Sequence, residues 1–150
     1  MAIPDFNNYG FLPEGIYDCT LGDIRARFCW NPHRTMLFES LCKFLQHEKW
    51  IAAHNCPILI DGSYVRSKEE PDDIDLVVDG SGAHNDAIKE LLFLRFKHGL
   101  IKESYHLDVW AEHPMIPNSL KEYFQYLGVK GAAGTNLTPH HKKGILRIRP

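Results

Sequence analysis

Two aspartates at alternate positions of a short apolar segment, Asp73 and Asp75, are the clearest candidates for chemistry in this sequence. If the segment is a β-strand, residues i and i+2 point the same way, so both carboxylates share one face while Ile74 and Leu76 enter the core. Two carboxylates about 6 Å apart repel each other by roughly 3 kcal/mol at an effective dielectric of about 20. Because hard oxygen ligands suit Mg²⁺ or Mn²⁺, we expect a divalent cation between them.

A third carboxylate, Asp108, fits the same site. It lies between Leu107 and Val109 in an apolar segment typical of a strand, and it faces the opposite way from both. If this strand pairs beside the one that carries Asp75, three carboxylates converge. Three carboxylates can hold two metal ions, which clamp the attacking and leaving oxygens of an in-line displacement. The alternative is a set of unconnected strand acids, each solvated or hydrogen-bonded, and this is the commoner role for any one of them.

A Gly-Ser pair precedes these acids, at the end of an apolar segment that is typical of a strand. Gly62 permits a tight turn out of that strand, and Ser63 could begin a helix whose free N–H groups bind phosphate. Nine residues separate Ser63 from Asp73, and they include Arg66 and Lys68. We expect these two cations to neutralise a triphosphate held at the turn.

The combination of Gly62-Ser63, the nine-residue spacer, Asp73-Ile74-Asp75-Leu76 and Asp108 resembles the signature of the DNA polymerase beta-type nucleotidyltransferase superfamily. Its short single-domain form is similar to the minimal nucleotidyltransferases of prokaryotic toxin–antitoxin and phage-defence systems. Residues 12–16 and 143–148 also resemble a bacterial branch of these proteins.

The resemblance implies a mixed β-sheet flanked by helices and a metal-dependent transfer reaction. A nucleoside monophosphate would pass from a nucleoside triphosphate to a hydroxyl of a protein or nucleic acid, with Mg²⁺ or Mn²⁺ as the cofactor. Gly62 and Ser63 would hold the β and γ phosphates. Asp73 and Asp75 would bind or bridge the metals, and Asp108 would complete the metal site and help to activate the acceptor hydroxyl.

The sequence departs from the superfamily pattern at Asp61, where an apolar or aromatic residue is common. An extra acid beside the phosphate site would weaken triphosphate binding or add a metal or acceptor contact. A second domain of the kind that selects base or template is also not recognised. Two alternatives stay open: an antitoxin-like subunit that neutralises a partner protein, with catalysis secondary or lost, and a metal-dependent nuclease. The nuclease ranks last, because the Asp-x-Asp segment contains no lysine.

The elements expected to position these residues alternate between helices and strands, which indicates an α+β domain of layered α/β type. Residues 1–31 are expected to form an irregular N-terminal arm with a short helix near residues 21–28, because they are rich in Pro, Gly and Asn. Residues 32–150 then form a single nucleotidyltransferase-like domain. We expect helices over 32–50, 84–97 and 119–127, strands over 58–60, 74–78, 106–111 and 145–148, and a flexible loop at 131–134.

The composition restricts the class of protein. With 150 residues, of which 44% are apolar and 24% charged, the chain is typical of one globular domain. No apolar run approaches the roughly 20 residues that span a bilayer, so we expect no membrane partner. Four cysteines without a CxxC pair indicate neither a zinc site nor a disulfide framework. Because the N-terminus also lacks a signal-peptide pattern, we expect a cytoplasmic location.

The charge is distributed unevenly along the chain. The net charge is −2, yet the basic C-terminal segment 128–150 carries five basic residues and no acid. Such a segment contacts phosphate or an acidic partner, or simply solubilises the chain. Within it, His140 and His141 precede Lys142 and Lys143, a group that either binds nucleic-acid phosphates or forms a solvated loop.

Several ring side chains have two open interpretations. His106 and Trp110 share the expected strand face of the third carboxylate, so they either contact the substrates or pack structurally. Tyr64 follows the Gly-Ser turn and either touches the nucleotide or enters the core. Phe93 and Phe96 extend the helix at 84–97 beyond one apolar stripe, which indicates burial on two sides or a protein interface.

Overall fold

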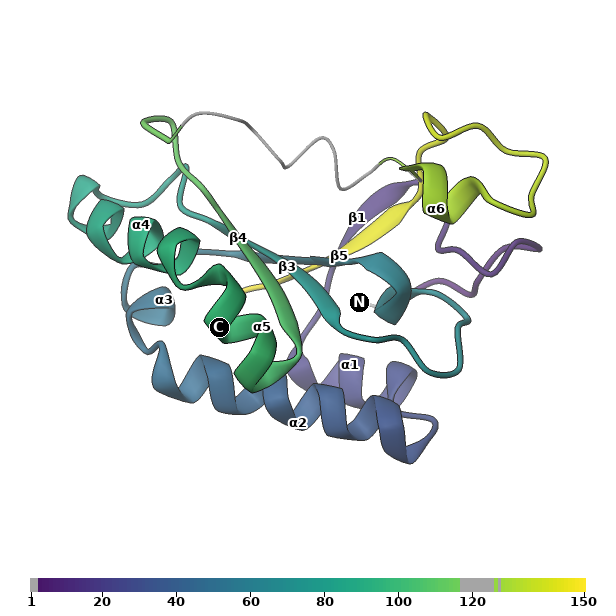
Figure 1. Ribbon diagram of the computed structural model, residues 1–150, viewed down its shortest axis with the longest axis horizontal. Helices are drawn as coiled ribbons and strands as arrows, with labels where there is room; N and C mark the ends of the chain where they lie inside the picture. Colours follow the sequence, from purple (N-terminus) through teal and green to yellow (C-terminus); the bar gives the residue numbers. More distant parts are fainter. Residues whose placement is uncertain (1–2, 117–125, 127) are drawn as a thin grey trace.

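The computed structural model describes residues 3–116, 126 and 128–150, and its centre is a five-stranded sheet (Figure 1). The strands are β1 (Gly15–Asp18), β2 (Ile58–Asp61), β3 (Ile74–Asp79), β4 (Leu107–Glu112) and β5 (Gly144–Ile148). Their order is β1-β5-β2-β3-β4. The β1–β5 and β3–β4 pairs are parallel, and β2 is antiparallel to both β5 and β3. The expected α+β class, with a mixed sheet and flanking helices, is therefore confirmed.

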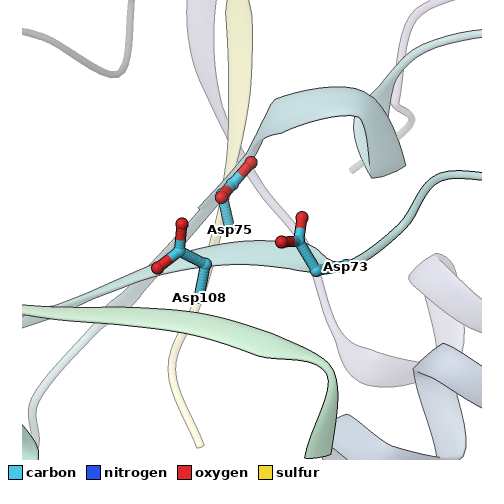
Figure 2. Close-up of side chains that lie close together, drawn as sticks. All are labelled: Asp73, Asp75 and Asp108. Atoms are coloured by element: carbon cyan, nitrogen blue, oxygen red, sulfur yellow. The ribbon is translucent and has the colours of Figure 1, made fainter. Parts of the chain in front are cut away.

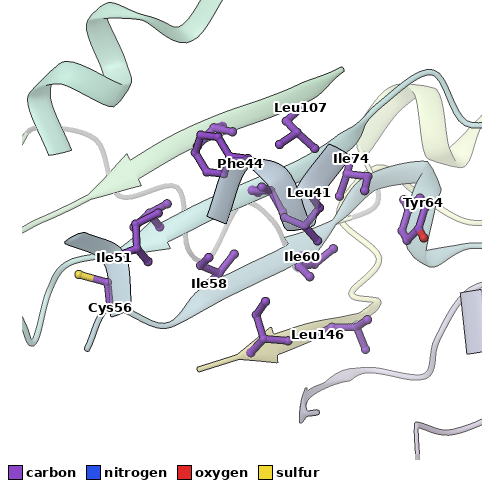
Figure 3. Packing of buried hydrophobic residues seen from close by; sticks show 14 of the residues in the cluster. Leu41, Phe44, Ile51, Cys56, Ile58, Ile60, Tyr64, Ile74, Leu107 and Leu146 are labelled. Atoms are coloured by element: carbon purple, nitrogen blue, oxygen red, sulfur yellow. The ribbon is translucent and has the colours of Figure 1, made fainter. Parts of the chain in front are cut away.

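The main core lies between one face of the sheet and the helices that pack on it. The described helices are α1 (Leu21–Phe28), α2 (Pro32–His47), α3 (Trp50–Ala53), α4 (Ile88–Phe96), α5 (His98–Tyr105) and α6 (Gly128–Ala132), with 3₁₀ turns η1 (Gly62–Val65) and η2 (Asn85–Ala87). Because strand side chains alternate, Ile58 and Ile60 of β2 share the helix-facing side. Figure 3 shows them packed with Leu41 and Phe44 of α2, all four almost fully buried.

Two rows of side chains cross the opposite face of the sheet, and the strand register fixes both. The first, which we call the acidic row, consists of Asp61, Asp75 and Asp108 on β2, β3 and β4. The second, the apolar row, consists of Leu59, Val77 and Trp110 on the same strands. The apolar row packs into a second, smaller buried cluster. This face therefore has an apolar centre with acids toward one end.

Helix α2 starts where the sequence predicts. The side chain of Asn31 accepts a hydrogen bond from the Arg34 N–H at 2.8 Å, and Pro32 occupies the first turn. The helix ends at His47 instead of residue 50, and α3 follows as a separate turn. The helix predicted over 32–50 is therefore confirmed, but it is three residues shorter than predicted.

The single helix expected over 84–97 is wrong in its boundaries. The structure has η2, then α4, and then α5 after a break at Lys97, whose N–H donates to the Phe93 carbonyl at 2.8 Å. Helix α5 was not predicted, because Gly99 interrupts its second position and its apolar periodicity is short. It ends at Tyr105, and the following residue, His106, has a left-handed φ of 55°. This second helix matters because it lies against β4.

The N-terminal region is not only an irregular arm. Helix α1 spans the expected residues and begins with a capping box between Thr20 and Asp23. Strand β1, however, pairs in parallel with β5, and Arg147 donates to Asp18 at 2.6 and 2.8 Å. The arm prediction was wrong for these residues, since the pairing joins segments at opposite ends of the sequence and leaves no local pattern.

The remaining predictions concern the C-terminal third. Apart from residue 126, the helix expected over 119–127 lies outside the described residues. The loop expected at 131–134 is wrong at its start, because α6 extends to Ala132. The closing strand is confirmed and begins one residue earlier, at Gly144. Within the described ranges, no helix combines the length and the apolar character that crossing a bilayer would require.

Candidate functional site

Three carboxylates converge at the acidic end of the sheet face. Asp75 and Asp108 are direct neighbours in the β3–β4 register, and Asp73 lies immediately before β3. One oxygen of each lies within 4.8 Å of the other two, and Figure 2 shows the three side chains turned to the same side of the sheet. The sequence prediction that these residues meet is therefore confirmed. We call them the carboxylate triad.

The triad is electrostatically unfavourable as an isolated group of acids. Burial, together with the nearby Asp73 and Asp108 carboxylates, raises the pKa of the Asp75 carboxyl to about 8. The negative charge that the three groups would carry together is thus in excess of what the surrounding protein balances. Oxygen donors of this kind and spacing suit a hard divalent cation.

Helix α5 supplies two further side chains to the triad, neither of which was among the predicted site residues. His98 and Lys102 are four residues apart, so they lie on one face of the helix. The His98 Nε2 contacts Asp108 Oδ1, and its ring lies 4.2 Å from the Trp110 ring, centroid to centroid. The Lys102 Nζ lies 3.5 Å from Asp73 Oδ2 and 4.0 Å from Asp108 Oδ2. Their i, i+4 spacing was the available signal, but it has meaning only once α5 is known.

Gly62 brings the turn after β2 into direct contact with the triad. Its φ of 76° is in the left-handed region, and a Cβ built on it would overlap Asp75 Oδ2. The predicted helix after the turn is a 3₁₀ turn, η1, so no α-helix begins at Ser63. Tyr64 is fully buried in the main core, which excludes the nucleotide contact considered for it.

Arg34 of α2 binds the backbone of the connection between β2 and β3. This side chain is fully buried, and it donates hydrogen bonds to backbone carbonyls of the connection at 2.7 to 3.3 Å, namely those of Ser63, Tyr64, Arg66 and Lys68. Burial lowers the pKa of its guanidinium to about 10, so it stays charged at neutral pH. Arg34 therefore fixes the backbone that carries the predicted phosphate-binding side chains.

All of the predicted site residues line one cleft. Its volume is about 810 Å³, and its lining includes Gly62, Ser63, Arg66, Lys68, Asp73, Asp75 and Asp108. It also includes Asp61, Asp72, Lys102, Tyr126, Lys130, Gly131 and Lys143. Asp72 thus adds a further acid to the wall of the same cleft. The cleft joins a cluster of acids to several cations, a charge pattern that fits a metal-bound polyphosphate.

The acid that departs from the superfamily pattern has its own counter-ion. Lys143 Nζ contacts Asp61 Oδ1, and both side chains are almost fully buried. Burial lowers the pKa of the Lys143 ammonium, while the adjacent carboxylate favours its charged form. Of the two interpretations given for the group at residues 140–143, nucleic-acid phosphate binding or a solvated loop, the solvated loop is wrong for Lys143, which is buried. The pair was not foreseen because its members are 82 positions apart in the sequence.

The other candidate side chains are spread over the molecule. His106 is exposed at the end of α5 and is not on a strand, so its expected place beside the third carboxylate is wrong. Trp110 does share that face, as the β3–β4 register requires. Lys142 is exposed and lies 3.9 Å from Glu14. Phe93 and Phe96 project from α4 with 49% and 88% of their surface exposed.

Residues 4–149 match the family of unknown function DUF6932. The chain belongs to this family. The match covers the whole sheet, the carboxylate triad and the buried Asp61–Lys143 pair. No curated protein and no solved structure is significantly similar to the chain.

Proposed function

We propose that this DUF6932 protein is a metal-dependent nucleotidyltransferase. It would transfer a nucleoside monophosphate from a nucleoside triphosphate to a hydroxyl of a protein or nucleic acid, as in prokaryotic toxin–antitoxin or phage-defence systems. The observation that carries the proposal is the meeting of the carboxylate triad with the Gly62-Ser63 turn in one cleft. The mixed sheet with helices on one face is compatible with the polymerase beta-like fold that the sequence resembles.

The residues present fit a divalent cation. Three carboxylates offer oxygens within 4.8 Å of one another, and the raised pKa of Asp75 indicates an excess of negative charge. Asp73, Asp75 and Asp108 would hold Mg²⁺ or Mn²⁺. When bound, such a cation supplies Lewis-acid stabilisation of the transferring phosphoryl group.

The protein's own groups would bind and orient the reactants. Gly62, Ser63, Arg66 and Lys68 would hold the triphosphate on the backbone that Arg34 fixes. In the transfer, the acceptor hydroxyl oxygen bonds to the α-phosphorus, the bond to the bridging oxygen breaks, and pyrophosphate leaves. The hydroxyl proton would pass to a carboxylate oxygen of Asp108, which His98 orients through the other oxygen.

Label transfer tests the proposal directly. The purified protein would be incubated with each α-labelled nucleoside triphosphate, Mg²⁺ and a set of acceptors comprising total RNA and the proteins encoded beside its gene. We expect label on one acceptor class, at least about a hundredfold less with Asp73→Asn/Asp75→Asn, and no change with Asp86→Asn, an exposed acid on η2. Absence of label on every acceptor, or equal label with the double variant, contradicts the proposal.

A second candidate is an antitoxin-like binding subunit, and one observation favours it. Ile88, Leu92, Phe93 and Phe96 of α4 line an apolar surface hollow away from the triad. Such a surface suits a protein partner. If binding is the function, neutralisation of a co-expressed toxin survives the Asp73→Asn/Asp75→Asn change and is lost with Phe96→Glu. The opposite pattern supports the transferase.

A further inference from the structure

The carboxylate triad has a cation of the protein's own beside it. The Lys102 ammonium lies 3.5 Å from Asp73 Oδ2 and 4.0 Å from Asp108 Oδ2, so it spans two of the three acids. The other oxygen of Asp108 is engaged by His98. Oδ2 is thus the Asp108 oxygen that faces a cation, and Lys102 already approaches it.

We propose that Lys102 is the resident counter-ion of the triad, which competes with a divalent cation for Asp73 and Asp108 and passes to the triphosphate when both ligands bind. This inference rests on the proposed function. It assigns to Lys102 a role in controlling when the metal binds, in addition to the binding roles of the predicted residues.

The exposure of the groups supports an exchange instead of a permanent ion pair. The Lys102 side chain is 51% exposed, whereas those of Asp73 and Asp108 are 18% and 19% exposed. The lysine can therefore leave on its flexible stem while the acids stay in place. The buried Lys143, by contrast, is enclosed with Asp61 and cannot make such an exchange.

The cleft provides the second position for the displaced ammonium. Lys102 lines the same cleft as Ser63, Arg66 and Lys68, where the triphosphate would bind. A divalent cation alone must displace Lys102 without giving it a new partner. With a triphosphate present, the ammonium gains phosphate oxygens, so metal and triphosphate each strengthen binding of the other by the same factor.

Mn²⁺ binding, measured by the electron paramagnetic resonance of the free ion, tests this exchange without any turnover. The measurement is made on the full chain with and without a non-hydrolysable nucleoside triphosphate. We expect Lys102→Gln to bind Mn²⁺ about fivefold more tightly than the unmodified protein when no nucleotide is present, as loss of an exposed ion pair implies. We also expect the mutual strengthening of Mn²⁺ and triphosphate binding to shrink by a similar factor.

Two variants serve as controls. Lys97→Gln removes the same charge nearby, but Lys97 pairs with Glu48 at 3.3 Å and does not reach the triad, so Mn²⁺ affinity should not change. Lys102→Arg keeps the cation and should bind Mn²⁺ as the unmodified protein does. Circular dichroism of each variant establishes that it is folded.

The outcomes separate this inference from the proposed function. If Lys102→Gln and the unmodified protein bind Mn²⁺ equally, Lys102 is not the counter-ion, while the metal site stands. If Lys97→Gln tightens Mn²⁺ as much as Lys102→Gln does, the effect is one of general charge and the inference is overturned. If no folded variant binds Mn²⁺ even with the triphosphate, the metal site of the proposed function fails, and this inference fails with it.

Discussion

Asp61 and Asp75 are direct neighbours across β2 and β3, yet their charges are balanced in opposite ways. Asp61 is enclosed with Lys143, and both side chains are almost fully buried. Asp75 lies among two further carboxylates, and burial together with their charge raises its pKa to about 8. One acid thus belongs to a closed ion pair, while the other belongs to an open group with excess charge. The difference separates a structural acid from a candidate ligand of a cation.

The largest expected effect is on the closed pair. Lys143→Ala leaves the Asp61 carboxylate buried without its ammonium, which we expect to lower the free energy of unfolding by about 3–5 kcal/mol. Denaturant titration followed by circular dichroism measures this. The exposed neighbour Lys142 provides the control, since Lys142→Ala should change stability by less than about 0.5 kcal/mol. Replacing both partners, with Asp61→Val and Lys143→Met, should recover most of the lost stability. If it does not, the Asp61–Lys143 pair stabilises the fold by more than neutralising a buried charge.

Gly62 follows Asp61 directly and lies against the side chain of Asp75, so a substitution at Gly62 tests how tightly the turn packs on Asp75. Gly62→Ala places a side chain in the left-handed region and against Asp75, so we expect destabilisation by about 3 kcal/mol. Combining it with Asp75→Ala, which removes the overlapping carboxylate, should restore part of this loss in the same denaturant titration. If the two losses simply add, Gly62 does not act through Asp75.

The open group should respond to pH in the opposite sense from an ordinary ion-paired aspartate. Because the Asp75 pKa rises from 3.8 to about 8 on folding, the folded state binds the extra proton between these values, and stability falls as pH rises from 4 to 8. Asp75→Asn removes this loss. Without divalent cations, we expect the variant to gain little stability over the unmodified protein at pH 4 and to become progressively more stable than it up to pH 8. A constant difference across this range would contradict the assignment.

The smallest expected effect is that of the metal on stability. Mg²⁺ at about ten times its dissociation constant should stabilise the unmodified protein by about 1.4 kcal/mol, or roughly 3 °C in melting temperature. Asp73→Asn/Asp75→Asn should abolish this shift. The control Asp86→Asn should show the same Mg²⁺-induced shift in melting temperature as the unmodified protein. Calorimetry at fixed ionic strength, with Ca²⁺ and Na⁺ in parallel, distinguishes specific binding from general screening. Equal shifts in the double variant would remove the triad as the metal site.

The contrast between the two acids also explains how much the sequence could reveal. The Asp73, Asp75 and Asp108 positions were predictable because strand alternation fixes the direction of each side chain locally. The partners Lys143, His98 and Lys102 were not. Lys143 reaches Asp61 from the residue just before β5, 82 positions along the chain, and the other two depend on a short helix with Gly99 at its second position.

The fold shows the same division. The core strands and α2 follow from apolar periodicity and from the Asn31-Pro32 helix start. Strand β1 could not be found in this way, since its partner in the sheet is β5 and its short sequence has no alternation strong enough to identify a strand. The assignment of residues 15–18 as a strand therefore depends on their pairing with β5, which no local sequence pattern reveals.

The position of β5 between β1 and β2 has a consequence for the order of assembly. The ribosome makes β1 more than a hundred residues before residues 144–148, and β1 acquires its neighbour in the sheet only after they are made. Lys143, immediately before this strand, supplies the ammonium that accompanies Asp61. A nascent chain that has exposed all three carboxylates therefore still lacks part of its sheet, and the cleft is complete only after β5 has been translated.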